Sequence, residues 1–217
     1  MNLPFTIDEF LEVFRKYNLS VFPMQVVFYL FGGLAIFHSI YKTRISDKIN
    51  LLFLSLLWLW SGIVYHILHF SGINKAAHLF GALNIVQAGL LYFYGIHREK
   101  ITFQFKWDIY GVAGGLLILY ALLVYPILGY LLGHQYPASP TFGVPCPTTI
   151  FTFGMLLWSG NKVPMAVLII PFLWSLIGTT AAIYLGMTED LGLFLSALIT
   201  AFLLYFRSPL SPKTMVG

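Results

Sequence analysis

Charged residues are scarce in this sequence of 217 residues, where 12 Lys and Arg and 8 Asp and Glu make up only 9%. In soluble domains roughly a quarter of the residues are charged, so this composition excludes a water-soluble globular protein. The single cysteine excludes a disulfide scaffold, and an aromatic content of 18% excludes a disordered chain. Because 59% of the residues are hydrophobic, the sequence predicts an integral membrane protein.

The apolar residues form seven blocks that are continuous rather than alternating, which favours helices over the strands of a barrel. A transmembrane helix needs ~20 mostly apolar residues. We therefore predict an all-α integral membrane bundle of seven transmembrane helices, at residues 21–41, 49–70, 76–96, 107–133, 147–160, 163–185 and 189–206. The fifth block is short.

The N-terminal segment, residues 1–20, differs from these blocks. Apolar residues such as Phe10 and Phe14 alternate there with charged ones such as Glu9 and Lys16. This pattern predicts an amphipathic helix that lies in the membrane interface. The domain organisation is then this helix followed by a single seven-span domain, residues 21–217.

Basic residues divide unequally between the two sets of loops that seven spans create. One set holds nine: Lys42, Arg44, Lys48, Arg98, Lys100, Lys106, Lys162, Arg207 and Lys213. The other set holds three: Arg15, Lys16 and Lys75. The positive-inside rule then predicts the N-terminus outside and the C-terminus in the cytoplasm. The same distribution explains the basic net charge without a nucleic-acid partner.

This topology gathers most reactive side chains at the outer surface. We take as candidate metal ligands His66, His134, Cys146, Glu189 and Asp190, which suit a divalent or soft metal ion. Tyr136 joins His66, His134 and Cys146 as a candidate solute contact. Asn84 and Gln87, near the midplane of the third span, either line a path or hydrogen-bond neighbouring helices.

The fifth segment carries the strongest pattern. Residues 109–161 contain no Asp, Glu, Lys or Arg, and four prolines within 133–149 prevent a regular helix. We predict a helix that starts at Pro147 with Cys146 as its N-cap and extends ~21 Å, too short for a ~30 Å core. A broken or re-entrant segment would precede it, and Thr148 and Thr149 would present hydroxyl and N–H groups to a ligand at the helix start.

The run from Gly133 to Gly154, which contains Pro-Thr-Phe-Gly-Val-Pro-Cys-Pro-Thr-Thr-Ile-Phe-Thr-Phe-Gly, resembles the signature of an uncharacterised bacterial membrane-protein family. That family is a domain of unknown function, and some members are labelled permease. Tyr65-His66 and Glu189-Asp190-Leu191-Gly192 are similar to it as well. The resemblance implies a multi-pass protein of the bacterial inner membrane but no established reaction.

Three functions stay open at this stage. The first is a permease or channel with a site for a small solute or a metal ion at the extracytoplasmic side. The second is a membrane-embedded, metal-dependent hydrolase, which resembles the seven-span ceramidase and progestin-receptor superfamily but lacks its His-x-x-x-His in the last span. The third is an accessory subunit of a membrane complex. Besides the lipid bilayer, the partners we expect are the solute or ion and either a second copy or other membrane subunits.

Overall fold

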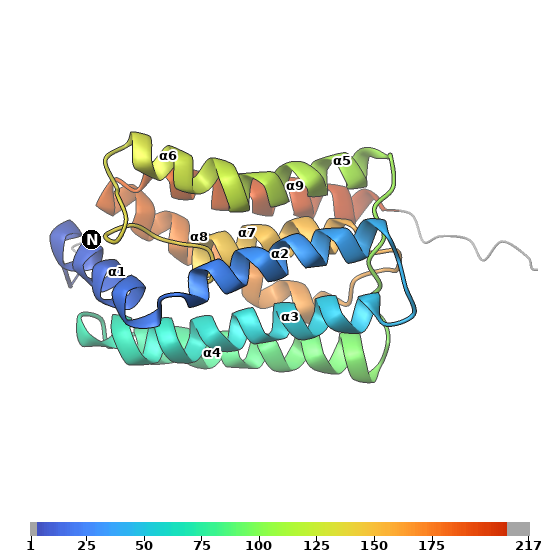
Figure 1. Ribbon diagram of the computed structural model, residues 1–217, viewed down its shortest axis with the longest axis horizontal. Coiled ribbons are helices and arrows are strands. Elements are labelled where there is room, and N and C mark those ends of the chain that lie inside the picture. Colours follow the sequence, from blue (N-terminus) through green and yellow to red (C-terminus); the bar gives the residue numbers. More distant parts are fainter. Residues whose placement is uncertain (1–3, 208–217) are drawn as a thin grey trace, which may run out of the picture.

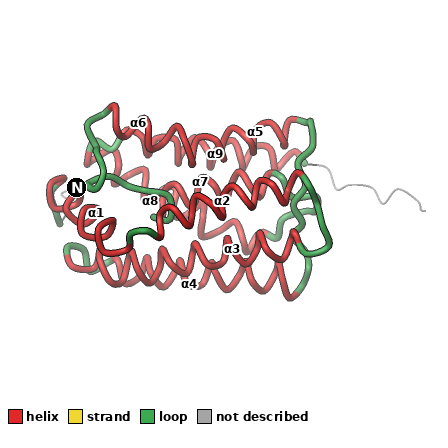
Figure 2. Tube along the Cα trace, in the orientation of Figure 1, coloured by secondary structure: helices red, strands yellow, loops and turns green. Residues whose placement is uncertain are grey.

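The structure is a computed structural model that describes residues 4–207, and within them it is a bundle of helices (Figures 1 and 2). The β-type pairing in the described part is limited to two isolated bridges, which confirms the all-α prediction. The helices are α1 (Ile7–Val21), α2 (Met24–Ile40), α3 (Ser46–Trp60), η1 (Ser61–His69), η2 (Phe70–Gly72), α4 (Ala77–Leu91), η3 (Tyr92–His97), α5 (Ile109–Leu119), η4 (Tyr120–Val124), α6 (Tyr125–Leu131), α7 (Pro145–Leu157), α8 (Met165–Leu185), η5 (Thr188–Asp190) and α9 (Leu191–Phe206).

Several of these helices join end to end into rods that are long and apolar enough to cross a membrane. There are five among the described residues: Ser46–Gly72, Ala77–His97, Ile109–Leu131, Met165–Leu185 and Thr188–Phe206. A sixth exists if α1 and α2, which meet at an 82° bend, count as one broken span. The multi-pass character is therefore supported. The count of seven stays a prediction, because α7 has only 13 residues.

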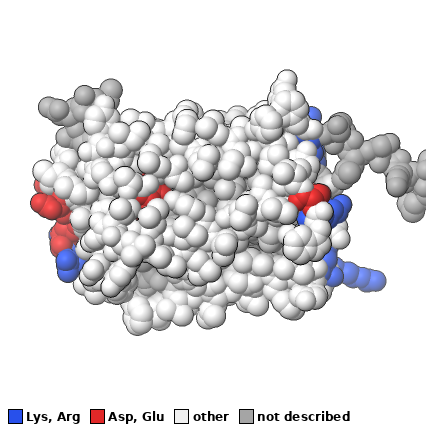
Figure 3. Space-filling model, turned by 90° about the horizontal axis from the view of Figure 1, so that it is seen from above, with Lys and Arg blue, Asp and Glu red and all other residues white. Residues whose placement is uncertain are grey.

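The sides of the bundle expose large apolar residues, which is the reverse of a soluble surface. Leu30, Leu116, Ile183 and Phe202 are each 60–66% exposed on four different helices. Figure 3 shows Lys and Arg atoms gathered mainly at one end and a long side almost free of charged atoms. This surface suits contact with lipid between two polar ends.

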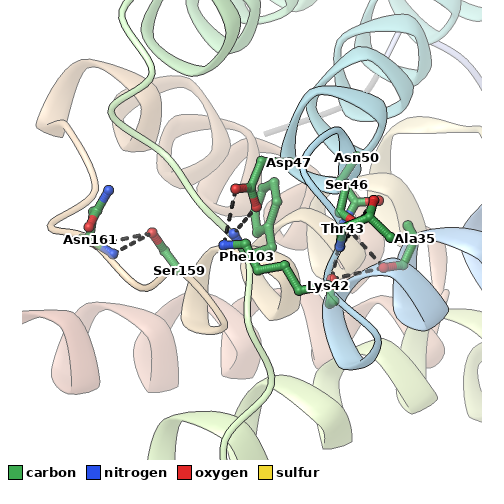
Figure 4. Close-up of polar contacts among 10 residues, drawn as sticks. Ala35, Lys42, Thr43, Ser46, Asp47, Asn50, Phe103, Ser159 and Asn161 are labelled. Carbon is green, nitrogen blue, oxygen red and sulfur yellow. Dashed lines mark hydrogen bonds and ion pairs between the residues drawn. The ribbon is translucent and has the colours of Figure 1, made fainter.

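The loops that the sequence analysis assigned to one side do meet at one end of the bundle. We call this the basic end, defined by residues 41–48, 97–108 and 158–162 with Arg207. Asp47 organises it: one carboxylate oxygen accepts from the backbone N–H of Phe103 at 2.7 Å, and the other pairs with Lys42 at 3.1 Å (Figure 4). The backbone of Gln104 also donates to the carbonyl of Trp158 at 2.9 Å. Lys213 lies outside the described residues.

Helix α1 closes the opposite end. It begins with a capping box in which Thr6 and Glu9 hydrogen-bond each other's backbone N–H. Its inward face buries Phe14 and Tyr17, and the Tyr17 hydroxyl accepts from the Trp60 indole N–H at 2.9 Å. This helix therefore packs on the bundle, and its position in a membrane interface stays a prediction.

Helix α7 is the centre of the bundle. Twelve of its thirteen residues are buried, because α3, α5, α8 and α9 surround it. It begins part-way along the bundle, and the non-helical segment 132–144, which contains several turns, leads to it from the end that α1 closes (Figure 1). The start predicted at Pro147 is wrong by two residues: the helix begins at Pro145, with Val144 as N-cap and Cys146 in the first turn.

Close approach of α5 and α7 depends on two glycines. A Cβ on Gly114 would lie 2.6 Å from the Gly154 carbonyl oxygen, and one on Gly154 would lie 2.7 Å from the Gly114 carbonyl oxygen. Because backbone lies opposite backbone here, neither helix can yield by a side-chain rotation. Small residues in membrane helices serve this kind of contact.

We expect Gly154→Ala to lower the free energy of unfolding by about 1–3 kcal/mol, since overpacking forces the two backbones apart. Thermal denaturation of the detergent-solubilised protein measures the change. Gly89→Ala on α4 is the matched control, because its Cβ would meet no neighbouring atom of residues 4–207 within 4 Å and the substitution favours the helix. A melting temperature equal to that of the wild type in Gly154→Ala would contradict the packing argument.

Candidate functional site

A cavity of about 380 Å³ lies at the end that α1 closes. Its walls are almost entirely apolar, and its outer edge is formed by Leu176, Thr180 and Tyr184, one turn apart on the exposed face of α8. We call it the aromatic cavity. It opens on a side of the bundle, and it is lined by Phe5, Phe10, Phe14, Tyr65, Phe70, Asn74, Phe80, Tyr125, Pro140, Val144, Pro145, Cys146, Trp174, Leu176, Ile177, Gly178, Thr180, Ala181, Ala182, Tyr184, Leu185 and Asp190.

The floor of this cavity is polar and is built from several helices. Tyr125 donates its hydroxyl to Asp190 Oδ1 at 2.5 Å. The Cys146 thiol and the Trp174 indole nitrogen both lie beside Gly178, whose Cβ position is 3.6 Å from the sulfur and 3.5 Å from the nitrogen. A Cβ there would be in ordinary contact with both groups, and its close neighbour would be Leu193 Cδ2 at 2.9 Å. The floor therefore combines a carboxylate, a thiol and an indole N–H.

The indole N–H of Trp174 is the unusual member of this set. Trp174 is only 8% exposed, and its Nε1 has no hydrogen-bond partner among residues 4–207. A buried donor without a partner costs about 1–3 kcal/mol relative to a satisfied one. Trp174 lines the cavity, but its nitrogen is enclosed beside Gly178, so a ligand oxygen can become its partner only if the floor shifts slightly to admit it.

A second polar pair lies directly behind the floor. His134 Nδ1 is 2.7 Å from Glu189 Oε1, with the carboxylate side chain fully buried and the imidazole 13% exposed. The Tyr120 hydroxyl donates to the Glu189 carbonyl oxygen at 2.7 Å. These contacts fix the short η5 helix, and therefore hold Asp190 at the cavity floor.

His66 lies behind the cavity wall rather than in its lining. Four aromatic rings surround it, and the ring of Trp174 is edge-on at 5.0 Å. The imidazole is fully buried, and neither of its nitrogens has a hydrogen-bond partner in the described part of the chain. All four of these rings line the cavity, so His66 packs behind its aromatic wall and supports it from outside.

The other predicted solute contacts lie away from the cavity lining. Thr149 donates to the carbonyl of Pro145 at 2.8 Å, and Thr148 is buried in α7. Gln87 donates to the carbonyl of Val167 on α8 at 2.9 Å, and Asn84 donates to the carbonyl of Phe80 within its own helix at 2.8 Å. Tyr136 is 53% exposed in the loop. Of the predicted site residues, Cys146 and Asp190 line the aromatic cavity.

The start of α7 also differs from the ligand-binding helix terminus that the sequence suggested. Pro145 and Pro147 have no N–H, and the N–H of Val144 donates to the carbonyl of Thr141 at 3.1 Å. Cys146 is thus the one residue of the first turn, 145–147, that carries a backbone N–H. The prolines reduce the number of backbone groups that burial would leave unsatisfied.

The predicted metal ligands do not meet as one group. Within residues 4–207, no three His, Cys, Asp or Glu side chains are arranged to hold a metal ion. His134 pairs with Glu189, Asp190 bonds Tyr125, and His66 lies behind Trp174.

Asn18 is a positioning residue that the sequence analysis missed. Its amide nitrogen donates to the carbonyls of Pro137 and Ser139, each at 2.7 Å, and its oxygen accepts from Thr141 at 2.8 Å. It thereby ties α1 to the non-helical segment that leads to α7. The sequence pattern does mark this residue, because Asn18 lies four residues after Phe14 and therefore interrupts the apolar face of α1 with a polar side chain.

Over residues 7–214 the sequence matches the model of a family described as a family of unknown function, DUF6064. This match confirms the expectation of an uncharacterised family defined by a domain of unknown function. No curated protein and no solved structure matches the chain.

A double-mutant cycle tests whether His134 and Glu189 form a buried pair. His134→Ala leaves a buried carboxylate without its partner, and we expect a loss of about 3–5 kcal/mol. His134→Ala combined with Glu189→Gln should lose less than the sum of the two single changes, with a coupling of about 1–3 kcal/mol in detergent unfolding.

The exposed pair Glu12 and Arg15, at 3.2 Å, is the matched control. Its coupling should stay below about 1 kcal/mol, because solvent screens it. Additive effects of His134 and Glu189 would contradict the arrangement described for η5.

Proposed function

The chain belongs to this family of unknown function, DUF6064, and we propose that it is a membrane-embedded binding protein for a small lipid-soluble molecule with one hydroxyl or carbonyl group. The aromatic cavity is the observation that carries the proposal. Ligand sites are typically concave, mostly apolar and equipped with a few polar groups that fix orientation. A volume of about 380 Å³ falls in the ordinary range for such sites.

The polar floor sets the chemistry of the ligand. Trp174 offers an unpartnered N–H to a carbonyl or hydroxyl oxygen, and Asp190 offers a carboxylate to a hydroxyl group. The aromatic walls favour a flat, carbon-rich body through stacked or edge-on contacts. A phenol, an alcohol or a quinone satisfies both requirements.

The position of the opening supports entry from the bilayer. The outer edge of the cavity lies on α8, a helix long and apolar enough to span a membrane. Phe10 and Phe14 of α1 cover the cavity at the end of the bundle that α1 closes. A ligand dissolved in lipid therefore reaches the floor without passing through water.

Binding rests on a cavity, whereas permeation would need a polar path that continues from it. Asn84 and Gln87 were the candidates for such a path, and neither of them lines the aromatic cavity. Their amide nitrogens bond the carbonyls of Phe80 and Val167, while their side-chain oxygens have no partner among residues 4–207. The metal-dependent hydrolase is supported less, because its five ligands do not form one group within residues 4–207.

The membrane orientation belongs to the same proposal. Eight of the nine basic residues assigned to the cytoplasm lie in the described loops and at Arg207, and these segments share the basic end. We place that end in the cytoplasm of a bacterial inner membrane and the aromatic cavity near the outer surface. The non-helical segment 132–144 and α7 together would complete the fifth of seven passes.

Protection of Cys146 tests the ligand class, because it is the only cysteine and lies at the cavity floor. We expect 1-naphthol to slow its reaction with N-ethylmaleimide several-fold, and naphthalene to slow it less, because only the naphthol bonds Trp174 and Asp190. Mass spectrometry of the intact protein gives the labelling rate.

Trp174→Phe should abolish the difference between the two probes. Trp107→Phe is the control, since Trp107 is 89% exposed at the basic end and remote from the cavity. Equal protection by naphthol and naphthalene in the wild type would refute a role for the polar floor, and no protection by either would refute the proposed binding.

Orientation is tested independently of the ligand. In a Cys146→Ser background, a cysteine in place of Lys75 should react in whole cells with a sulfonated maleimide that cannot cross membranes. A cysteine in place of Lys100 should react only after the cells are opened. The reverse pattern would overturn the proposed orientation while leaving the cavity proposal intact.

A further inference from the structure

A second groove lies between α8 and α9 at the basic end and has a volume of about 390 Å³. Its body is apolar and includes Leu168 and Phe172 from α8 and Ala201 and Leu204 from α9. From Met165 to Phe172 it follows α8 for about 10 Å, at 1.5 Å per residue. This groove runs along two helices that qualify as membrane spans.

The rim of the groove is basic. Lys162 and Arg207 line it together with the amide-bearing Asn161, and no Asp or Glu of the described residues does. The adjacent hollow is different, because Asp108 lines it beside Lys106. Arg207 lines both hollows, so Asp108 faces it from the neighbouring one, whereas the lining of the groove between α8 and α9 itself holds Lys162 and Arg207 and no carboxylate.

Arg207 is held in place rather than free in solvent. Its guanidinium carbon lies 4.1 Å from the centroid of the Tyr110 ring, and Nη2 donates to the carbonyl of Leu157 at 2.9 Å. These contacts orient the charge toward the end of the bundle where α8 begins and α9 ends. A prearranged cation loses little side-chain entropy when it binds an anion.

We propose that this groove is a specific site for an anionic phospholipid, with the phosphate at Lys162 and Arg207 and one acyl chain along Leu168 and Phe172. The charge of the rim selects an anionic headgroup, and the apolar body selects a chain-bearing lipid over a soluble phosphate. Basic pockets between membrane helices on the cytoplasmic side bind lipid headgroups in this way. The site is independent of the aromatic cavity.

Native mass spectrometry from mixed micelles of dioleoylphosphatidylglycerol and dioleoylphosphatidylcholine tests the proposal. The wild type should retain the anionic lipid in preference to the neutral one. Because a basic residue near the membrane contributes ~1 kcal/mol, we expect Lys162→Gln to reduce this preference about fivefold. Lys162→Arg should restore it. Arg207→Gln should also reduce the preference for the anionic lipid, and size-exclusion chromatography shows whether that variant stays folded.

Two further variants separate the groove from general surface charge. Lys100→Gln removes a basic residue at the same end that does not line the groove, so it should leave the preference unchanged. Ala201→Phe fills the apolar body without a change of charge, and it should displace the lipid. Added glycerol 1-phosphate should not compete, because it has no chain.

Three results would overturn the proposal. Equal retention of the two lipids by the wild type would remove the headgroup selectivity. A loss in Lys100→Gln as large as in Lys162→Gln would assign the preference to diffuse charge. Competition by glycerol 1-phosphate, with no effect of Ala201→Phe, would leave a site for phosphate alone.

Discussion

The start of α7 inside the bundle is the constraint on which the rest of the structure depends. A helix that begins away from water must satisfy or remove the N–H groups of its first turn. Pro145 and Pro147 remove two of them, and Val144 bonds Thr141. The chain reaches this point through the non-helical segment 132–144. The aromatic cavity lies at the start of α7, where Pro145 and Cys146 line it.

The cavity is consequently assembled from parts that do not adjoin in sequence. Asn18 on α1 holds the non-helical segment 132–144 through the carbonyls of Pro137 and Ser139. The pair of His134 and Glu189 connects the beginning of that segment to η5, and so positions Asp190. Each tie uses a buried polar group with a defined partner, and such groups are costly in an apolar bundle unless they are paired. The polar groups at this end therefore specify a geometry more than they add stability.

The membrane class, the helix positions and the broken fifth segment could be predicted because each depends on residue type along the chain. The aromatic cavity could be predicted only in part. Cys146 and Asp190 are conspicuous among apolar residues, whereas Trp174 and Tyr125 look like ordinary packing residues until their neighbours are known. His66 shows the limit most clearly. It lies in η1, a π-helical stretch, so the spacing of an α-helix does not give the direction of its side chain.

Helix α8 connects the two ends of the molecule. Its first half, as far as Phe172, forms one wall of the groove at the basic end, and its second half, from Trp174 onward, forms one wall of the aromatic cavity. Pro171, at the end of the first half, removes one backbone hydrogen bond from the helix. Helix α4 contacts both halves, through Gln87 at Val167 and Phe80 at Trp174. A single helix thus forms one wall of the groove at the basic end and one wall of the aromatic cavity at the other end.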